Sequence, residues 1–439
     1  MIPDSEPLIA VGLIEEADTV DFELQGDCLL GGRAVPAGCY RAAHAACAAV
    51  LTDGHGAELV RAQQLHLTPA APPESFFILH NVAIGREFHW QRLQSQRFRG
   101  ELVLDTFGRA GITAVNRIGL EAYLESVICS EMSPGSDAEF LKTHCVISRS
   151  WLLAQLELKH AARESTAPAA WTDAAAHRNF DVCNDDHCQR YHGISLVNVA
   201  VQQALAATRG QVLVFNGAIC DTRFSKCCGG ITERFSTCWQ DVDFDYLAPV
   251  ADCADADAVF APPVSTEADA RKFILASPKA FCNVTDGSLL VRVLPDFDFE
   301  TQQFFRWSVT LAQDELQDLL KQKTGIDFGE IKSLTPIARG DSGRIYKLKI
   351  SGTKAEKVLA KELAIRRALS PSHLYSSAFI VEASEEKNGI PARFTLRGAG
   401  WGHGVGLCQI GAAAMAAQGR RYDAILAHYF RGAALKTIY

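Results

Sequence analysis

Hydrophobic and polar residues alternate along the first quarter of the chain. Short alternating runs, such as 8–14 and 101–105, are broken by glycine, proline and asparagine. Such runs are typical of strands joined by turns, so we expect mostly β-structure over residues 1–118. The alanine-rich run 41–50 fits a strand and a helix equally well.

Helical spacing replaces this alternation from residue 119 onwards. Residues 119–132 and 136–160 predict two consecutive helices, and further helices are expected at 312–323, 408–418 and 422–430. The sequence thus predicts an α+β fold. Its expected parts are a β-rich N-terminal region (1–100), a helical core with a Cys/His loop (101–254), a smaller α/β lobe that faces the core across a cleft (255–390), and a glycine-rich segment with two helices that completes the core (391–439).

Composition and charge narrow the class of protein. The 439 residues are 48% hydrophobic and 21% charged, an ordinary globular balance, and the net charge is −8. An acidic chain is a poor polyanion binder, so nucleic acid is not an expected partner. No apolar run approaches the ~20 residues of a membrane helix, and the first residues lack the basic end and apolar middle of a signal peptide.

The first predicted helix places a carboxyl group on its apolar face. Apolar side chains recur at helical spacing at positions 120, 123, 124, 127 and 128, and Glu131 is the next member of the series. Pro134 ends the helix just beyond it. A carboxyl group that loses hydration keeps a proton more readily and can deliver it to a leaving group. The alternative is a buried glutamate with a structural partner. Glu121 and Glu125 fall on the other face, as solvated charges.

The second predicted helix carries an arginine in phase with its apolar residues. Arg149 shares this phase with Leu141, Cys145 and Leu152. An inward arginine beside Glu131 is either one half of a buried ion pair or a group that orients a substrate. Both interpretations stay open at this stage.

Cysteines and histidines gather between residues 177 and 192. Cys183, His187 and Cys188 lie in one short loop, with His177 and His192 nearby. Thiolate and imidazole together are typical of zinc sites, but a fourth ligand is missing from the local pattern. A Cys183–Cys188 disulfide explains the spacing equally well.

Other cysteines among the fourteen are interpreted more simply. Cys129, Cys145 and Cys408 follow apolar helical phase and are expected to be buried free thiols. The adjacent pair Cys227 and Cys228 is a candidate source of the missing zinc ligand.

Glycine occupies every even position from 398 to 406. In an extended strand, one face of this segment would be bare backbone, while the other would present Trp401 and His403. A bare face allows a ligand or another segment to approach closely. The alternative is a tightly packed core strand with a structural histidine.

Taken together, these segments resemble the SpoIID/LytB family, typified by stage II sporulation protein D. The resemblance is carried, in family order, by 120–132, 141–151, 180–193, 224–233, 400–412 and 425–432, of which GWGHGVGxxQxGA is the most specific. Three features depart from the family pattern: Glu-Met-Pro is Glu-Met-Ser-Pro, Cys408 replaces a serine, and the segment around 253–305 has no match.

The resemblance implies a peptidoglycan lytic transglycosylase that acts on glycan strands stripped of stem peptides. It makes Glu131 the catalytic acid, with Arg149, His403 and Gln409 as candidate substrate-binding residues. It also implies a zinc site at Cys183, His187 and Cys188, with no cofactor needed for the chemistry. The expected location is the cell envelope, periplasmic or extracytoplasmic.

Transglycosylation requires only one carboxyl group, whereas hydrolysis generally requires two. Glu131 would protonate the glycosidic oxygen, then accept the proton of the C6 hydroxyl that closes on C1 to form 1,6-anhydro-muramic acid. One alternative is a non-catalytic wall-binding protein that stimulates a cell-wall amidase. Another is a zinc-dependent hydrolase built on the Cys/His loop.

Overall fold

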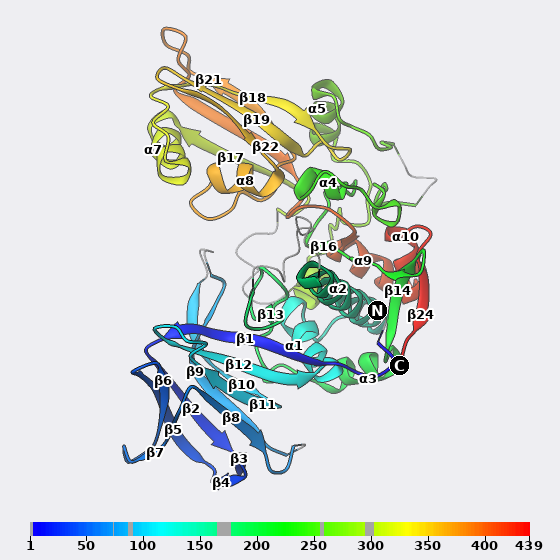
Figure 1. Ribbon diagram of the computed structural model, residues 1–439. Coiled ribbons are helices and arrows are strands. Elements are labelled where there is room, and N and C mark those ends of the chain that lie inside the picture. The colour runs from blue at the N-terminus through cyan, green and yellow to red at the C-terminus, as the bar shows by residue number, and fades with distance from the viewer. Residues whose placement is uncertain (1–2, 73, 87–90, 165–176, 255–258, 295–302) are drawn as a thin grey trace. The chain divides into compact units, whose positions relative to one another are not determined.

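The computed structural model describes residues 3–72, 74–86, 91–164, 177–254, 259–294 and 303–439 (Figure 1). The chain forms two compact units, residues 1–212 with 436–439, and residues 213–435. Strands and helices both contribute substantially and the N-terminal region is rich in strands, which confirms the predicted α+β class. The four-part division and the cleft stay predictions. No helix among the described residues is long and apolar enough to span a membrane.

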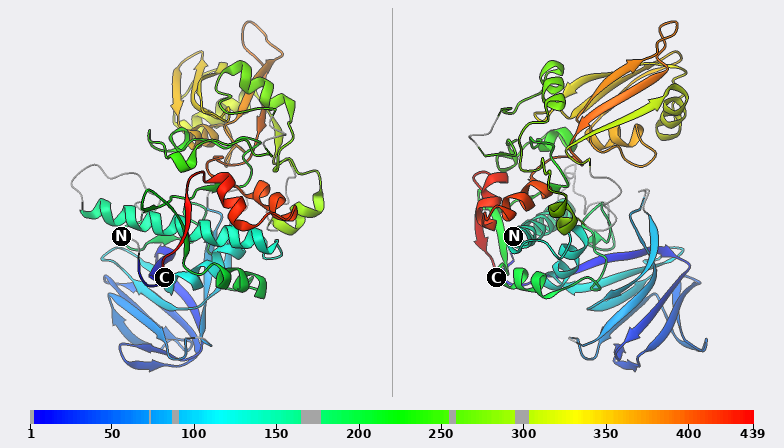
Figure 2. Two further views of the ribbon diagram at one scale, coloured as in Figure 1. Left: turned by 90° about the vertical axis from the view of Figure 1, so that its right-hand side faces the viewer. Right: turned by 180° about the vertical axis from the view of Figure 1, so that it is seen from behind.

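The strands described within the first 119 residues form two sheets, one of which also includes a short strand from residues 182–183 (Figure 2). The seven-stranded sheet has the order β13-β1-β12-β11-β8-β3-β4, and the six-stranded sheet has the order β10-β9-β2-β5-β6-β7. Their strands are β1 (Leu8–Ala17), β2 (Thr19–Gln25), β3 (Cys28–Leu30), β4 (Arg33–Val35), β5 (Gly38–Ala45), β6 (Ala48–Asp53), β7 (Glu58–Ala62), β8 (Gln64–Pro69), β9 (Phe76–Ile84), β10 (Arg92–Phe98), β11 (Glu101–Asp105), β12 (Ile112–Gly119) and β13 (Val182–Cys183).

Alternation explains how these sheets form. Strand β2 buries Val20, Phe22 and Leu24, and the residues between them are more exposed. Strand β12 contacts both β2 and β5, so the buried faces of the two sheets meet in a shared core. The ambiguous run 41–50 belongs to strands β5 and β6, which form a hairpin.

In the part of the first unit that the structure describes, three helices follow the sheets: α1 (Leu120–Glu131), α2 (Ala138–Glu164) and α3 (Val199–Ala207). The two predicted consecutive helices are therefore confirmed. They pack on one another, and α1 also contacts β1 and β12. Helix α1 is buried on almost all sides, so the expectation that Glu121 is a solvated charge is wrong.

The second unit is built from smaller sheets and short helices. Its described elements include β14 (Gln211–Phe215), β15 (Ala218–Ile219), β16 (Phe224–Ser225), α4 (Phe235–Cys238), α5 (Glu267–Ala276), α6 (Gly287–Val293), β17 (Arg306–Ala312), α7 (Gln313–Thr324), β18 (Ile331–Arg339), β19 (Ile345–Gly352), β20 (Glu356–Ala360), α8 (Glu362–Ala368), β21 (Phe379–Ser384), β22 (Arg393–Ala399), β23 (Leu407–Cys408), α9 (Gln409–Ala417), α10 (Tyr422–Tyr429) and β24 (Ala434–Thr437). The sheets β17-β22-β21 and β18-β19-β20 share one apolar core with α7 and α8.

The glycine-alternating segment is not the extended strand that its period of two predicts. Strand β22 ends at Ala399, and the four even glycines from 400 to 406 all have left-handed φ angles. A Cβ atom at Gly404 would lie 2.4 Å from Cζ of Arg344. That fully buried guanidinium donates to the carbonyl of Gly402 at 3.2 and 3.1 Å and to the Ser342 hydroxyl at 2.9 Å. Gly404, and Gly400 beside it, therefore make room for a buried arginine.

Candidate active site and metal centre

Glu131 is the last residue of α1, and its side chain points into the first unit. Only 9% of the residue is exposed. The helix ends because Met132 is extended. The carboxylate oxygen Oε1 accepts a hydrogen bond from the backbone N–H of Arg190 at 3.0 Å. The predicted position, an inward carboxyl at a helix end, is therefore observed, and its catalytic role stays a prediction.

The Arg190 amide belongs to a loop that is fixed against α1 and α2. Gln189 bridges the two helices, since its side chain accepts from the Tyr123 hydroxyl and donates to the Ser148 carbonyl, both at 3.3 Å. The backbone N–H of His192 donates to the Ser130 hydroxyl at 3.1 Å. Contacts on both sides of residue 190 thus hold its amide beside Glu131.

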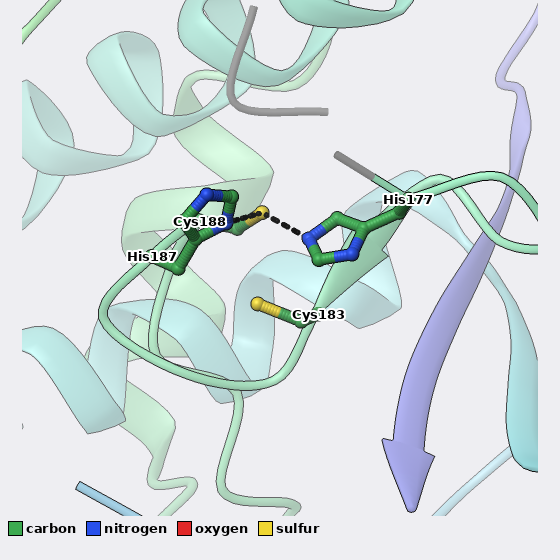
Figure 3. Close-up of side chains that lie close together, drawn as sticks. All are labelled: His177, Cys183, His187 and Cys188. Atoms are coloured by element: carbon green, nitrogen blue, oxygen red, sulfur yellow. Dashed lines mark hydrogen bonds between the residues drawn. The ribbon is translucent and has the colours of Figure 1, made fainter. Parts of the chain in front are cut away.

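The same loop carries the Cys/His cluster (Figure 3). The potential ligand atoms of His177, Cys183, His187 and Cys188 all lie within 4.8 Å of one another. The Cys188 sulfur is 3.4 Å from Nε2 of His177 and 3.5 Å from Nδ1 of His187. His177 therefore completes the set that the local pattern left one ligand short, and Cys227 and Cys228 are not part of it.

Two thiolates and two imidazoles are the donor set of a structural zinc site, and their convergence fits tetrahedral coordination. Hydrogen bonding from the Cys188 thiol and from both histidines outweighs burial and lowers the pKa of Cys183 to about 2. The structure forms no disulfide between Cys183 and Cys188. Of the two interpretations that the sequence left open, this arrangement favours the metal.

The acidic residues of this loop are engaged by other partners. Asp185 accepts hydrogen bonds from the backbone N–H groups of Gly85 and Arg86 at 3.1 and 2.7 Å. Asp186 accepts from Nε of Arg190 at 2.6 Å. Both carboxylates therefore stabilise the loop. None of these contacts places either carboxylate beside Glu131.

Arg149 pairs with Glu121 and not with Glu131. Its guanidinium is fully buried and donates to both carboxylate oxygens of Glu121, at 2.9 and 2.6 Å. It also donates to the carbonyls of Cys145 and Gln211. Burial alone would raise the pKa of Glu121, but Arg149, with help from the Tyr439 hydroxyl, holds it below its ordinary value. These contacts favour the buried ion pair over substrate binding by Arg149.

His403 and Gln409 lie in the second unit. Nδ1 of the half-buried His403 accepts from the backbone N–H of Val405 at 3.0 Å, and its ring packs edge-on against Trp239. Loss of hydration, reinforced by the charges of Arg223 and Arg344, keeps the pKa of His403 well below its ordinary value. Gln409 is buried at the first position of α9. Glycan binding by either residue stays a prediction.

A second group of potential metal ligands was not foreseen. Cys228, Asp252, Cys282 and Cys408 place one ligand atom each within 4.8 Å of one another in the second unit. Cys408 is the buried free thiol that was expected, but it lies in strand β23, one residue before α9, and close to these other ligand atoms. Four segments supply these residues, so no local spacing in the sequence signals the cluster.

Comparisons with known proteins place these features in a family. Residues 108–215 match the Stage II sporulation protein family, SpoIID, and residues 233–406 match a domain of unknown function, DUF8618. An uncharacterised protein of Brachyspira hyodysenteriae is 27% identical over 318 residues, which cover 72% of this chain and 67% of that protein.

The amidase enhancer of Bacillus subtilis is 25% identical over 322 residues, which cover 72% of this chain and 40% of that protein. The SpoIID match contains both Glu131 and the four Cys and His residues of the first cluster. Residues 108–215 thus form a SpoIID domain, and together with this relative the match supports membership of the SpoIID/LytB family.

Proposed function

We propose that this protein is a peptidoglycan lytic transglycosylase with Glu131 as its single general acid and base. Family membership supports a function connected with the cell wall. The finer proposal rests on one observation, a largely buried carboxyl group at the end of α1 whose orientation is fixed by the Arg190 amide. Fixed orientation matters because proton transfer requires the acid to lie within hydrogen-bond reach of the leaving oxygen.

The proposed reaction uses the carboxyl group twice. Protonated Glu131 gives its proton to the glycosidic oxygen as C1 of muramic acid becomes oxocarbenium-like. The resulting carboxylate then accepts the proton of the C6 hydroxyl, whose oxygen bonds to C1 and forms the 1,6-anhydro ring. No water enters the product, so a second carboxylate that activates water is not required.

The Cys/His cluster would support this acid from a distance. A bound zinc ion would hold His177, Cys183, His187 and Cys188 together, and Arg190 follows two residues after the last of these. Metal would therefore stabilise the loop that orients Glu131. Under this proposal, chelation lowers activity although the metal does no chemistry, so the product identifies the mechanism better than metal removal does.

A second candidate function is stimulation of a cell-wall amidase. It is favoured by the similarity to the Bacillus subtilis amidase enhancer, although the match covers only 40% of that protein. In that case Glu131 would be a structural or glycan-binding residue. Extracytoplasmic location and peptidoglycan as the binding partner are common to both candidates.

Mass spectrometry of amidase-stripped glycan strands tests the proposal. Wild type, Glu131→Gln and Glu125→Gln are each incubated with the strands. Glu125 is the matched control because it lies on the same helix and pairs with Arg99 at 2.9 Å. We expect anhydro-muramic ends from wild type and Glu125→Gln, and at least a 100-fold lower yield from Glu131→Gln, in line with loss of a general acid.

Other products would change the assignment. Reducing ends in place of anhydro ends would indicate hydrolysis and would direct attention to the metal cluster or a second carboxylate. Absence of cleavage by folded, glycan-bound wild type, together with faster peptide release by an added amidase, would establish the enhancer function instead.

A further inference from the structure

The second unit contains a cluster of sulfur and oxygen ligands with no role in the proposed reaction. Cys228 follows β16, Asp252 and Cys282 flank α5, and Cys408 forms the end of β23. All four side chains are essentially inaccessible, with exposed fractions of 0 to 2%. Their ligand atoms lie within 4.8 Å of one another.

The spacing of the sulfurs suits a metal better than a disulfide. The sulfurs of Cys228 and Cys282 are 3.7 Å apart. Two thiolates on one tetrahedral zinc ion, each bonded at ~2.3 Å, are separated by about 3.8 Å. A disulfide requires about 2.05 Å, so both sulfurs would have to move toward each other to form one.

Backbone amides around the cluster donate to its sulfurs. The Cys228 N–H donates to the Cys408 sulfur at 3.2 Å, and the Gly230 N–H donates to the Cys228 sulfur at 3.4 Å. Such donors stabilise thiolates, which are the forms that bind metal.

The carboxylate of Asp252 is oriented by a second layer of contacts. It accepts from the Tyr429 hydroxyl at 2.5 Å and from the Cys282 N–H at 3.0 Å. Helix α9 passes directly over it, because a Cβ atom at Gly411 would lie 2.7 Å from both carboxylate oxygens. Ligating carboxylates are typically held by hydrogen bonds of this kind.

A nearby arginine does not take the place of a metal. Arg306 lies close enough to interact electrostatically with Cys282. Its guanidinium donates to the backbone carbonyls of Phe273, Ile274, Gly229 and Phe305. Three thiolates and a carboxylate in so small a volume would repel one another strongly, and a bound divalent cation would offset half of their charge.

We propose that Cys228, Asp252, Cys282 and Cys408 form a second, structural zinc site that joins four segments of the 213–435 unit. Three thiolates and one carboxylate complete a closed tetrahedral set, as in structural zinc sites generally. The adjacent Cys227 interacts with Cys282 and Cys408 and lies outside this ligand set.

Metal content of the purified full chain tests the site. Elemental analysis and native mass spectrometry should find two zinc ions in wild type, one in Cys183→Ser/Cys188→Ser and one in Cys282→Ser. Cys238→Ser is the matched control, because Cys238 is a buried thiol of the same unit that hydrogen-bonds the His403 carbonyl. It should retain both ions.

A cobalt spectrum keeps the test decisive if Cys282→Ser does not fold. In Cys183→Ser/Cys188→Ser, both thiolates of the first cluster are gone, so thiolate-to-cobalt absorption can arise only from the second. Absence of that absorption, a wild-type content of one zinc, or a Cys228–Cys282 disulfide would overturn the proposal. Loss of the second zinc in Cys227→Ser, with retention in Asp252→Asn, would overturn the ligand assignment.

Discussion

Replacement of Arg149 by methionine should destabilise the first unit strongly. The substitution removes a fully buried guanidinium and leaves the carboxylate of Glu121, whose side chain is 11% exposed, without its cation. Tyr439 and Gly210 remain as donors to that carboxylate but carry no charge. Breaking a buried ion pair in this way costs ~3–5 kcal/mol, because the remaining charge stays buried and uncompensated.

The double variant Arg149→Met/Glu121→Gln should recover much of this loss, because no unpaired charge remains. We expect a free energy of unfolding at least ~2 kcal/mol higher than the sum of the two single effects predicts. Urea unfolding followed by tryptophan fluorescence, to which the buried Trp151 beside Arg149 on α2 contributes, measures this difference. A loss below ~1 kcal/mol in Arg149→Met, or simple additivity, would contradict the buried-pair interpretation.

The pH dependence of stability provides a second check on the same pair. The pKa of Glu121 in the folded protein lies below its ordinary value of 4.5, so folding favours the carboxylate. Its contribution is complete above pH 4.5 and disappears as the pH falls through the folded-state pKa. As the pH falls below 4.5, the free energy of unfolding should therefore decrease more for wild type than for Glu121→Gln.

Turnover by the double variant decides the role of Arg149. If the arginine only neutralises Glu121, the folded double variant should cleave glycan strands at nearly the wild-type rate. A stable double variant whose cleavage rate is lowered 100-fold would instead indicate that Arg149 acts on the substrate.

Three further changes have defined outcomes. Gly404→Ala should lower the free energy of unfolding ~2 kcal/mol more than Gly419→Ala, because both positions have left-handed φ angles but only Gly404 faces the Arg344 guanidinium. Equal urea midpoints for the two variants would contradict this. Cys188→Ser should reduce zinc content by one ion and glycan cleavage at least ~10-fold, whereas unchanged cleavage by the zinc-free loop would separate the cluster from Glu131. Asn198→Ala should lower the free energy of unfolding by ~1 kcal/mol, because the Asn198 side chain caps α3 by accepting from the Val201 N–H. Thermal unfolding measures this loss, and an unchanged stability would show that the cap is dispensable.

Local patterns predicted the parts of the site that are local. The position of Glu131 follows from helical spacing and Pro134, and three of the four ligands of the first cluster lie within six residues. Glu121 was misassigned because amphipathic reasoning assumes one solvated face, whereas α1 is buried on nearly all sides. An isolated helix pattern cannot reveal that its polar face meets a buried arginine from α2.

Long-range features could not be predicted from spacing. The cluster of Cys228 and Cys408 depends on strands β16 and β23 pairing in parallel, which no sequence period reports. The glycine alternation predicted an extended strand because period two is the strand signal. This period does not distinguish a pleated strand from a segment in which every second residue is a left-handed glycine, two of them against Arg344.

The sequence separation of the two ligand clusters sets an order for assembly during synthesis. Residues 177–188 leave the ribosome almost together, so the first cluster can close after a short search. The second requires Cys408 to meet Cys228 across 180 residues, so its first thiols stay exposed until Cys408 has been synthesised. During that interval they are available to oxidants and to incorrect metal ions. The compartment and timing of folding thus affect assembly of the second cluster more than assembly of the first.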